Sequence, residues 1–325
     1  MSYAIETKGL RKSYNGTEVV RSIDLRVEQG ELFALLGPNG AGKTTTIHML
    51  STLIKPDGGC ASVAGFDIVD HARNVRRRIS LTGQFAALDE GLSGLQNLKL
   101  ISRLYGHSAK AARSVSEELI EAFGLSEAKD RAVQHYSGGM RRRLDIAASI
   151  VTEPDVIFLD EPTTGLDPQS RVQVWDVVRS LLKRGTTVLL TTQYLEEADQ
   201  LADRIAVMDK GNLIAEGTPR QLKASIGDRT LTVQFNEQAD RDKLGTWLYE
   251  AHALTVLQDD HPLVHKIPVK DAIAAHQAIH SLMENGFAID YFALSEPSLD
   301  EVFLSLTKSR KEALHECKPA YSDSE

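Results

Sequence analysis

The sequence predicts an α/β protein with a largely parallel sheet, followed by a smaller α+β domain. Short apolar runs alternate with longer helical patterns up to about residue 217, and this alternation is typical of parallel sheets covered by helices. The pattern restarts beyond residue 228, where an alternating strand opens a second series of elements. The chain has 325 residues, of which 42% are hydrophobic, so it can form two domains with separate cores.

The first series of elements surrounds a glycine-rich turn. A buried strand is expected at 31–36, before the turn, and a helix from Lys43 to about Leu53, after it. Elsewhere, apolar spacings of three and four residues predict helices, and short apolar runs predict strands. These elements are helices at 92–105, 109–123 and 172–182, strands at 156–159 and 187–190, and a hairpin at 205–217.

The second series predicts a small α+β domain. Its expected elements are strands at 231–235 and 287–292 and helices at 240–249, 271–283 and 299–306. The residues from 308 onward are polar, so we expect a disordered tail. The predicted division of the chain is therefore 1–227, 228–307 and 308–325.

Composition argues against a nucleic-acid partner. The chain has 37 basic and 45 acidic residues, for a formal net charge of -8, whereas general nucleic-acid binding needs a basic surface. The short basic clusters at 76–78 and 141–143 are interpreted as solvated faces.

Cysteines and apolar runs indicate a cytoplasmic protein without membrane spans of its own. Cys60 and Cys317 lie far apart in the sequence and form no disulfide framework or metal-binding spacing. The first residues lack the apolar core of a signal peptide. No run approaches the roughly 18 apolar residues that a membrane-spanning helix needs.

The strongest motif is the glycine-rich turn itself. Its residues are Gly37, Pro38, Asn39, Gly40, Ala41, Gly42, Lys43 and Thr44. They match G-x-x-x-x-G-K-[ST] between a predicted strand and a predicted helix, which is the context of a phosphate-binding loop. Glycines let backbone N–H groups surround phosphate oxygens, and the following helix directs its positive end at the same anion. Lys43 is then expected on the β- and γ-phosphates and Thr44 on magnesium.

Two carboxylates form a second candidate site. Asp160 and Glu161 follow the apolar run at 156–159, so they are expected at the carboxyl end of a buried strand, where open α/β sheets bind ligands. By itself such a pair is usually a solvated turn, but beside a phosphate-binding loop it becomes specific. Asp160 is placed to hold magnesium and Glu161 to polarise the attacking water.

The motifs together resemble the ATP-binding cassette (ABC) ATPases. The stretches at 37–45, 137–140, 159–162 and 165–168 occur in the order found in that family, and the resemblance covers about residues 3–225. It implies a P-loop NTPase cassette with a RecA-like core and a helical subdomain, ATP and Mg²⁺ as cofactors, and a homodimer that closes on two ATP molecules. It also adds Thr45 to the phosphate loop, Ser137, Gly138 and Gly139 as the signature that meets the other subunit's nucleotide, and Asp167 as part of the D-loop.

Three more residues take roles only through the resemblance. Gln84 matches the Q-loop, which contacts magnesium and the attacking water. Tyr14 falls where an aromatic ring often stacks on adenine, the alternative being a partly buried surface tyrosine. Gln193 stands where the family normally has a histidine that reaches the γ-phosphate, and glutamine can donate a hydrogen bond but cannot carry a proton. The signature departs more modestly, with Tyr136 and Met140 in place of leucine and glutamine.

Further stretches resemble the daunorubicin-resistance branch of ABC-2 drug exporters. They lie at 83–90, 136–145, 191–203 and 296–303, and the last fits that branch's C-terminal domain. The resemblance implies a peripheral ATPase at the cytoplasmic face of the membrane, with separate transmembrane permease subunits. A drug, an antibiotic, a lipid or another amphiphile is compatible with it as the exported compound.

Two other functions compete with an export ATPase. Gln193 favours a regulatory switch that binds ATP and barely hydrolyses it, whereas Lys43, Asp160 and Glu161 argue against such a switch. A cassette of DNA repair or translation is expected to carry a coiled-coil insertion or a second cassette, and the sequence shows neither. For the C-terminal domain, the simplest interpretation is that it stabilises the dimer or covers a surface of the cassette; a ligand-sensing role is the alternative, for which no residue there argues.

Overall fold

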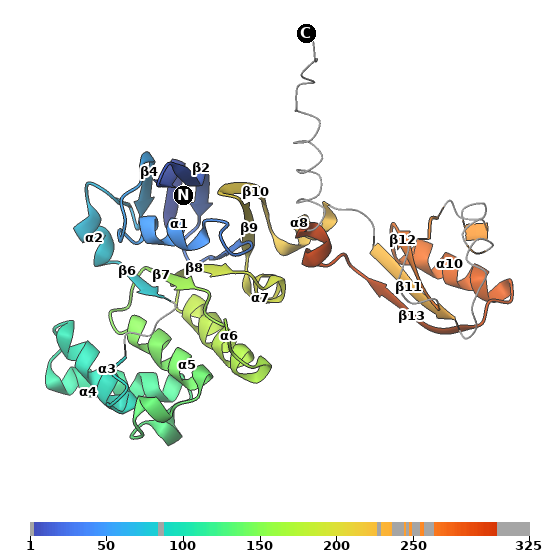
Figure 1. Ribbon diagram of the computed structural model, residues 1–325. Coiled ribbons are helices and arrows are strands. Elements are labelled where there is room, and N and C mark those ends of the chain that lie inside the picture. The colour runs from blue at the N-terminus through green and yellow to red at the C-terminus, as the bar shows by residue number, and fades with distance from the viewer. Residues whose placement is uncertain are drawn as a thin grey trace, which may run out of the picture. The chain divides into compact units, whose positions relative to one another are not determined.

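The computed structural model describes residues 3–83, 88–225, 229–235, 244, 247–248, 254–256 and 263–303. The chain divides into two compact units, Met1–Thr218 and Pro219–Glu325 (Figure 1). The boundary expected at 227/228 lies outside the described residues, as do most of the helix expected at 240–249 and the tail at 308–325, so those expectations stay predictions. No helix within the described ranges is long and apolar enough to cross a membrane.

A six-stranded sheet forms the centre of the first unit. Its order is β10-β9-β3-β8-β7-β6, and every pair is parallel except the β9–β10 hairpin. The strands are β3 (Leu32–Leu36), β6 (Ile79–Thr82), β7 (Val156–Asp160), β8 (Thr187–Thr192), β9 (Arg204–Asp209) and β10 (Asn212–Gly217). Strands β3, β7 and β8 are buried along their whole length, because helices cover both faces (Figure 1).

Three helices follow strands of this sheet. They are α1 (Lys43–Leu50), α6 (Pro168–Lys183) and α7 (Leu195–Leu201). In Figure 1, α1 lies on one side of the central strands and α6 on the other. The strands predicted at 31–36, 156–159 and 187–190, the helix predicted at 172–182 and the hairpin at 205–217 are confirmed, with ends displaced by a few residues.

An antiparallel sheet, which the sequence analysis did not anticipate, packs on α1. Its order is β2-β1-β4-β5, with β1 (Ile5–Tyr14), β2 (Thr17–Val27), β4 (Gly58–Val63) and β5 (Phe66–Asp67). Charged and apolar residues are mixed along β1 and β2, since only one face of these strands is buried. Ile5, Leu25, Phe33, Ile47 and Phe158 belong to the core that joins the two sheets and α1.

A helical subdomain lies between β6 and β7 in the sequence. Its main helices are α3 (Gly94–Leu104), α4 (Ala109–Ala122) and α5 (Gly138–Ser149), with the short turns η1 (Ser126–Ala128) and η2 (Val133–His135), and α2 (Ala72–Arg76) precedes β6. Serine side chains cap the three main helices: Ser93, Ser108 and Ser137 each accept a backbone N–H from the first turn. The helices predicted at 92–105 and 109–123 are confirmed.

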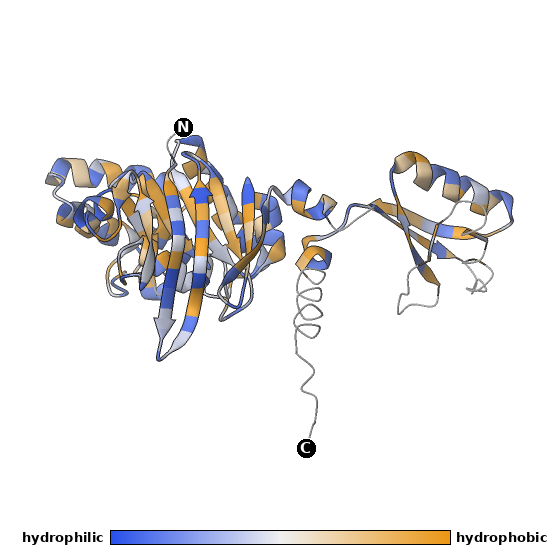
Figure 2. Cartoon of the chain, turned by 90° about the horizontal axis from the view of Figure 1, so that it is seen from above, coloured by the Kyte–Doolittle hydropathy of each residue, from blue (hydrophilic) through white to orange (hydrophobic). Residues whose placement is uncertain are grey.

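The second unit is α+β, as predicted. Its three-stranded antiparallel sheet has the order β12-β11-β13. The elements are α8 (Pro219–Ala224), β11 (Arg229–Phe235), β12 (Val264–Val269), α10 (Ala272–Glu284), β13 (Ile289–Ser295) and a helical segment at 299–303. Strand β12 was not predicted. Figure 2 shows hydrophobic residues alternating with hydrophilic ones along α10, whose buried face forms a separate core with the sheet.

The core of the second unit predicts a large cost for truncating Leu282. This α10 side chain is fully buried, so Leu282→Ala should lower the free energy of unfolding of that unit by about 3 kcal/mol through lost burial and a cavity. Urea unfolding followed by Trp247 emission measures the loss, in a Trp175→Phe background that leaves one tryptophan of the two. The control is Ile273→Ala on the same helix, which is exposed and should cost less than about 0.5 kcal/mol. Equal costs would contradict the assigned packing.

Candidate functional site

The glycine-rich loop connects β3 to α1 and is closely packed at two of its glycines. A Cβ on Gly37 would come within 2.2 Å of the Met208 carbonyl oxygen. Gly42 caps α1 with a φ of 105°, and a Cβ there would come within 2.7 Å of the Val19 carbonyl oxygen. Glycine is therefore required for space at both positions, and at Gly42 for its left-handed conformation as well. The residues expected to hold phosphate line a depression of about 230 Å³ together with Val19 and Glu161: Asn39, Gly40, Ala41, Gly42, Lys43, Thr44 and Thr45.

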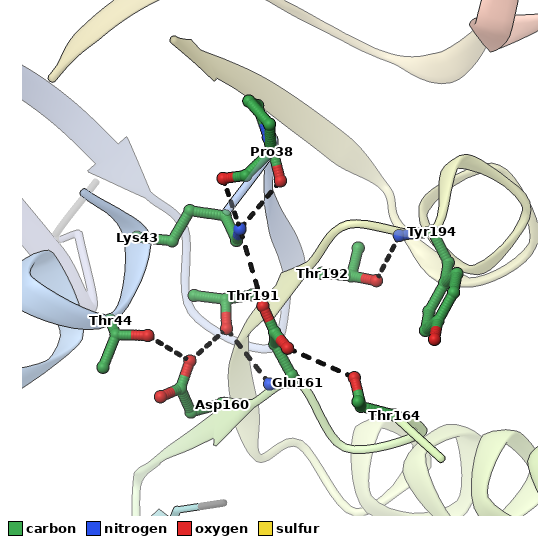
Figure 3. A network of polar contacts seen from close by, with 10 residues as sticks. Pro38, Lys43, Thr44, Asp160, Glu161, Thr164, Thr191, Thr192 and Tyr194 are labelled. Carbon is green, nitrogen blue, oxygen red and sulfur yellow. Dashed lines mark hydrogen bonds and ion pairs between the residues drawn. The ribbon is translucent and has the colours of Figure 1, made fainter. Parts of the chain in front are cut away.

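Lys43 is a buried cation inside this loop. Its ammonium donates to the carbonyl oxygens of Gly37 at 2.7 Å and Pro38 at 3.1 Å, and it lies 3.6 Å from the Glu161 carboxylate (Figure 3). Burial lowers the pKa of Lys43, while the charges of Glu161 and Asp160 act in the opposite direction. The nearby positive charge and the start of α1 suit this depression to an anion.

Asp160 ends strand β7 beside two threonine hydroxyls. The hydroxyl of Thr44 donates to its Oδ1 at 3.1 Å, and that of Thr191 donates to the same oxygen at 2.5 Å. The strand pairing aligns Asp160 with Thr191 on β8, so the sheet itself sets this geometry. A carboxylate and a threonine hydroxyl in contact are oxygen ligands of the kind that Mg²⁺ prefers.

Glu161 makes a sharp turn out of the strand. Its φ is 48°, in the left-handed region, a conformation that costs free energy in a non-glycine residue and is held by neighbouring contacts. Its N–H donates to both the carbonyl and the hydroxyl oxygen of Thr191, each at 3.1 Å. Its Oε2 accepts from the Thr164 hydroxyl at 3.2 Å, and its side chain lines the depression formed by the glycine-rich loop.

The signature residues lie at the start of α5, against the start of α6. Ser137 caps α5 through the Met140 N–H at 3.2 Å, and Asp167 caps α6 through the Ser170 N–H at 2.9 Å. A Cβ on Gly139 would come within 2.4 Å of the Ser170 hydroxyl. The contact with Ser170 therefore explains the glycine at 139 and brings the two N-termini together.

Tyr136, the first departure from the usual signature, is a buried residue that positions α5. Its hydroxyl donates to the Ala128 carbonyl at 2.8 Å, and the Arg131 guanidinium lies 5.5 Å from its ring. A Cβ on Gly94 would come within 2.3 Å of the tyrosine hydroxyl. The tyrosine is thus accommodated by a glycine on the neighbouring helix α3.

Arg142 contradicts the expectation that residues 141–143 form a solvated face. Its side chain is 11% exposed, and it donates to the carbonyl oxygens of Gly83 at 2.7 Å, Pro162 at 2.9 Å and Asp160 at 3.3 Å. Burial lowers the pKa of Arg142, against the charge of Asp145 at 3.3 Å. The i,i+3 spacing of Arg142 and Asp145 allows an ion pair along the helix, but such pairs also form on exposed faces, so the sequence carried no signal of this burial.

For three of the predicted site residues, the described part of the chain shows no contact with the other residues of the candidate site. Gln84 lies outside the described residues. Tyr14 ends β1, is 45% exposed and has the Lys12 ammonium 5.7 Å from its ring centre, and nothing in the structure tests adenine stacking. Gln193 lies between β8 and α7, next to Thr192, whose hydroxyl accepts the Tyr194 N–H at 2.9 Å (Figure 3).

The sequence analysis did not single out three residues that contact the site: Thr164, Thr191 and Arg142. Isolated hydroxyls and charges carry no motif that would reveal them.

The contacts of Arg142 predict a large stability difference from its neighbour Arg141. Arg142→Met removes the donor to three backbone carbonyls and leaves Asp145 with one charged partner fewer, so we expect a loss of roughly 3 kcal/mol in the free energy of unfolding. Arg141→Met is the control, since Arg141 forms one exposed pair with Glu90 and its loss should cost about 0.5 kcal/mol. Urea unfolding followed by Trp175 emission, in a Trp247→Phe background that leaves one tryptophan of the two, compares the variants. Similar losses would refute the buried role of Arg142.

Two family models match the chain. The model of ABC transporters matches residues 20–164, which include the phosphate loop, the signature and both carboxylates. The model of the ATP-binding protein DrrA1-3-like C-terminal domain matches residues 217–307. These matches confirm the two family assignments that the motifs predicted.

Curated relatives match nearly the whole chain. The daunorubicin/doxorubicin resistance ATP-binding protein DrrA of Streptomyces peucetius is 52% identical over 323 residues, which cover 98% of each chain. The doxorubicin resistance ATP-binding protein DrrA of Mycobacterium tuberculosis is 46% identical over 318 residues, 96% of each chain. The Nod factor export ATP-binding protein I of Burkholderia orbicola is 43% identical over 75% of this chain and 81% of its own length.

Solved structures confirm the cassette fold. The cbiO1 protein of Clostridium perfringens, part of the ABC transporter complex cbiONQ, has a TM-score of 0.64 and 26% identity, covering 69% of this chain and 92% of its own. An ATP-binding subunit of an ABC transporter has a TM-score of 0.61 and 28% identity, covering 68% and 92%. The chain belongs to the ATP-binding subunits of ABC transporters, and within them to the drug-resistance group that contains the DrrA proteins.

Proposed function

We propose that two copies of this ATPase close on ATP and Mg²⁺ and drive the export of a hydrophobic drug or antibiotic through separate permease subunits, at the cytoplasmic face of the membrane. The observation that carries the proposal is the single depression in which Lys43, Thr44 and Glu161 meet beside Asp160. A phosphate group, a cation and a water molecule each find suitable partners there.

Lys43 and the loop serve the nucleotide. In the structure the ammonium donates to two carbonyls of its own loop, which are neutral acceptors, and lies 3.6 Å from the Glu161 carboxylate. The β- and γ-phosphates of ATP are charged acceptors and bind an ammonium more strongly. The glycine conformations that the packing imposes already direct the loop around this depression, so little reorganisation opposes nucleotide binding.

Thr44 and Asp160 fit a magnesium ion. The hydroxyl and the carboxylate are in contact at 3.1 Å, and together they provide hard oxygen ligands. Mg²⁺ would supply positive charge that neutralises the phosphate oxygens during transfer. Gln84 is proposed as a third ligand from the sequence resemblance alone.

Glu161 is proposed to accept a proton from the attacking water. Thr164 holds one of its oxygens, and the backbone contact with Thr191 fixes the turn that carries it. Gln193 is proposed to donate a hydrogen bond to the γ-phosphate. Because its amide cannot be protonated, hydrolysis proceeds here without the charge that an imidazolium would add.

The signature is proposed to complete the site of a second copy. Ser137, Gly138 and Gly139 begin a helix, where free N–H groups and the helix dipole favour an anion. Asp167 lies at the adjacent N-terminus of α6, where hydrogen bonds from Ser170 lower its pKa. Each copy would bring the adjacent N-termini of its α5 and α6 to the phosphate loop of the other copy.

The exported compound is proposed from the names of the relatives. Those with the highest identity reported above are named for daunorubicin and doxorubicin resistance, which favours a hydrophobic drug. The relative named for Nod factor export is 43% identical and keeps lipids or other amphiphiles as the alternative. A regulatory subunit with little hydrolysis is the other alternative, favoured by Gln193 and opposed by the intact Lys43–Glu161 arrangement.

Glu161→Gln should separate hydrolysis from binding. Loss of the proton acceptor is expected to lower magnesium-dependent phosphate release by roughly 100-fold or more, while the affinity for ATP is retained. Glu196→Gln, at an exposed position in the first turn of α7, is the control and should behave like the wild type. Phosphate release and equilibrium ATP binding on purified protein measure the two effects. Undiminished release by Glu161→Gln would remove Glu161 from the mechanism, and binding without any turnover in both proteins would favour the regulatory alternative.

Gly138→Glu should abolish ATP-dependent dimers. A Cβ at Gly138 meets only the Leu166 side chain, at 3.4 Å, so the monomer can accept a side chain, but a carboxylate there repels the phosphate of the partner. Light scattering with ATP, in the Glu161→Gln background, is expected to show dimers for the parent and monomers for the variant, with equal ATP binding. Leu53→Glu, at an exposed position after α1, is the control. Dimers of the Gly138 variant would contradict the proposed closure.

A further inference from the structure

A fully buried carboxylate that the proposed mechanism does not use contacts the loop that follows Glu161. Glu197 is on α7 and has an exposed fraction of 0%. One of its oxygens, Oε1, accepts from the Thr163 hydroxyl at 2.8 Å and from the Trp175 indole N–H at 3.2 Å. The three side chains come from three different segments of the fold.

Each of these segments carries a residue of the candidate site. Thr163 lies two positions after Glu161, in the loop that leaves β7. Trp175 lies on α6, whose N-cap is Asp167. Glu197 itself lies four positions after Gln193, and α7 begins with the Ala198 N–H donating to the Tyr194 carbonyl at 3.3 Å. The Glu197 carboxylate therefore links the loop that follows Glu161 to the helices α6 and α7, which follow Asp167 and Gln193.

A carboxylate is a costly choice for such a position. Burial raises the pKa of Glu197, and the hydrogen bonds from its neighbours and the charge of Arg171 only oppose this effect. An apolar side chain of similar size would fill the same volume without the desolvation cost. What an apolar side chain cannot do is hold the Thr163 hydroxyl and the Trp175 indole at fixed places.

We propose that Glu197 is a positioning residue that holds the loops of Glu161 and Gln193 and the helix α6 in the arrangement required for hydrolysis, and that Trp175 reports this arrangement. The inference rests on the proposed roles of Glu161 and Gln193. It assigns to Glu197 no contact with nucleotide. Its loss therefore acts on turnover, and the affinity for ATP stays close to that of the wild type.

The test compares substitutions that keep or remove the shared acceptor. Glu197→Gln keeps an oxygen for both donors, whereas Glu197→Met removes it at similar volume, and Thr163→Val removes one donor only. Glu196→Met is the matched control, since Glu196 is the preceding residue and is exposed. All variants are made in a Trp247→Phe background, which leaves Trp175 as the remaining one of two tryptophans.

Three quantities are measured: kcat and KM of phosphate release, ATP affinity, and the emission of Trp175 with and without ATP. Glu197→Met is expected to lower kcat on the order of 100-fold with little change in KM, as displaced catalytic groups do, and to shift Trp175 emission. Thr163→Val should lower kcat less than Glu197→Met does. Glu197→Gln should retain most of the wild-type kcat and the wild-type Trp175 emission. Glu196→Met should match the wild type.

Several outcomes would overturn the proposal. Wild-type kcat in Glu197→Met shows that the shared acceptor is unnecessary, and equal losses in Glu197→Gln and Glu197→Met show that hydrogen bonding is not what matters. If the wild type shows no turnover, the proposed function fails, and the ATP-dependent change in Trp175 emission alone tests the role of Glu197. An ATP-dependent change in Trp175 emission that is the same in Glu197→Met as in the wild type then refutes the coupling.

Discussion

The contact between Asp160 and the two threonine hydroxyls is the constraint on which the site depends. It joins the carboxyl ends of β7 and β8 to the first turn of α1, so the strands and the phosphate loop cannot be displaced independently. The parallel register of β7 and β8 places Asp160 opposite Thr191. From that point the chain must turn sharply at Glu161, and the turn delivers a carboxylate to the ammonium of Lys43.

A second constraint links the helical subdomain to the same strand. The guanidinium of Arg142 reaches from α5 to the backbone of Asp160, Pro162 and Gly83. Carbonyl groups are the acceptors, so the link depends on the course of the backbone more than on the identity of those residues. These contacts therefore fix the position of the signature, which begins the same helix, relative to the end of β7.

Much of the cassette could be predicted from the sequence, because its central strands are continuous apolar runs and its phosphate loop has a strict spacing. The antiparallel sheet was missed because β1 and β2 mix charged and apolar residues, as strands with one solvated face do. Within the site, the loop and the paired carboxylates were recognised from their motifs. Arg142 was misassigned, and Thr191 and Glu197 were not singled out, since their roles arise from partners far away in the sequence.

The packing of Tyr136 against Gly94 has a consequence for how this chain can vary. The tyrosine hydroxyl occupies the space that a side chain at position 94 would need. Which residue is tolerated at one of the two positions therefore depends on the residue at the other. A leucine at 136, as in the usual signature, would vacate that space and free position 94 for larger residues. In this chain, a residue larger than glycine at position 94 would therefore need a smaller side chain at position 136 or a shift of the tyrosine ring.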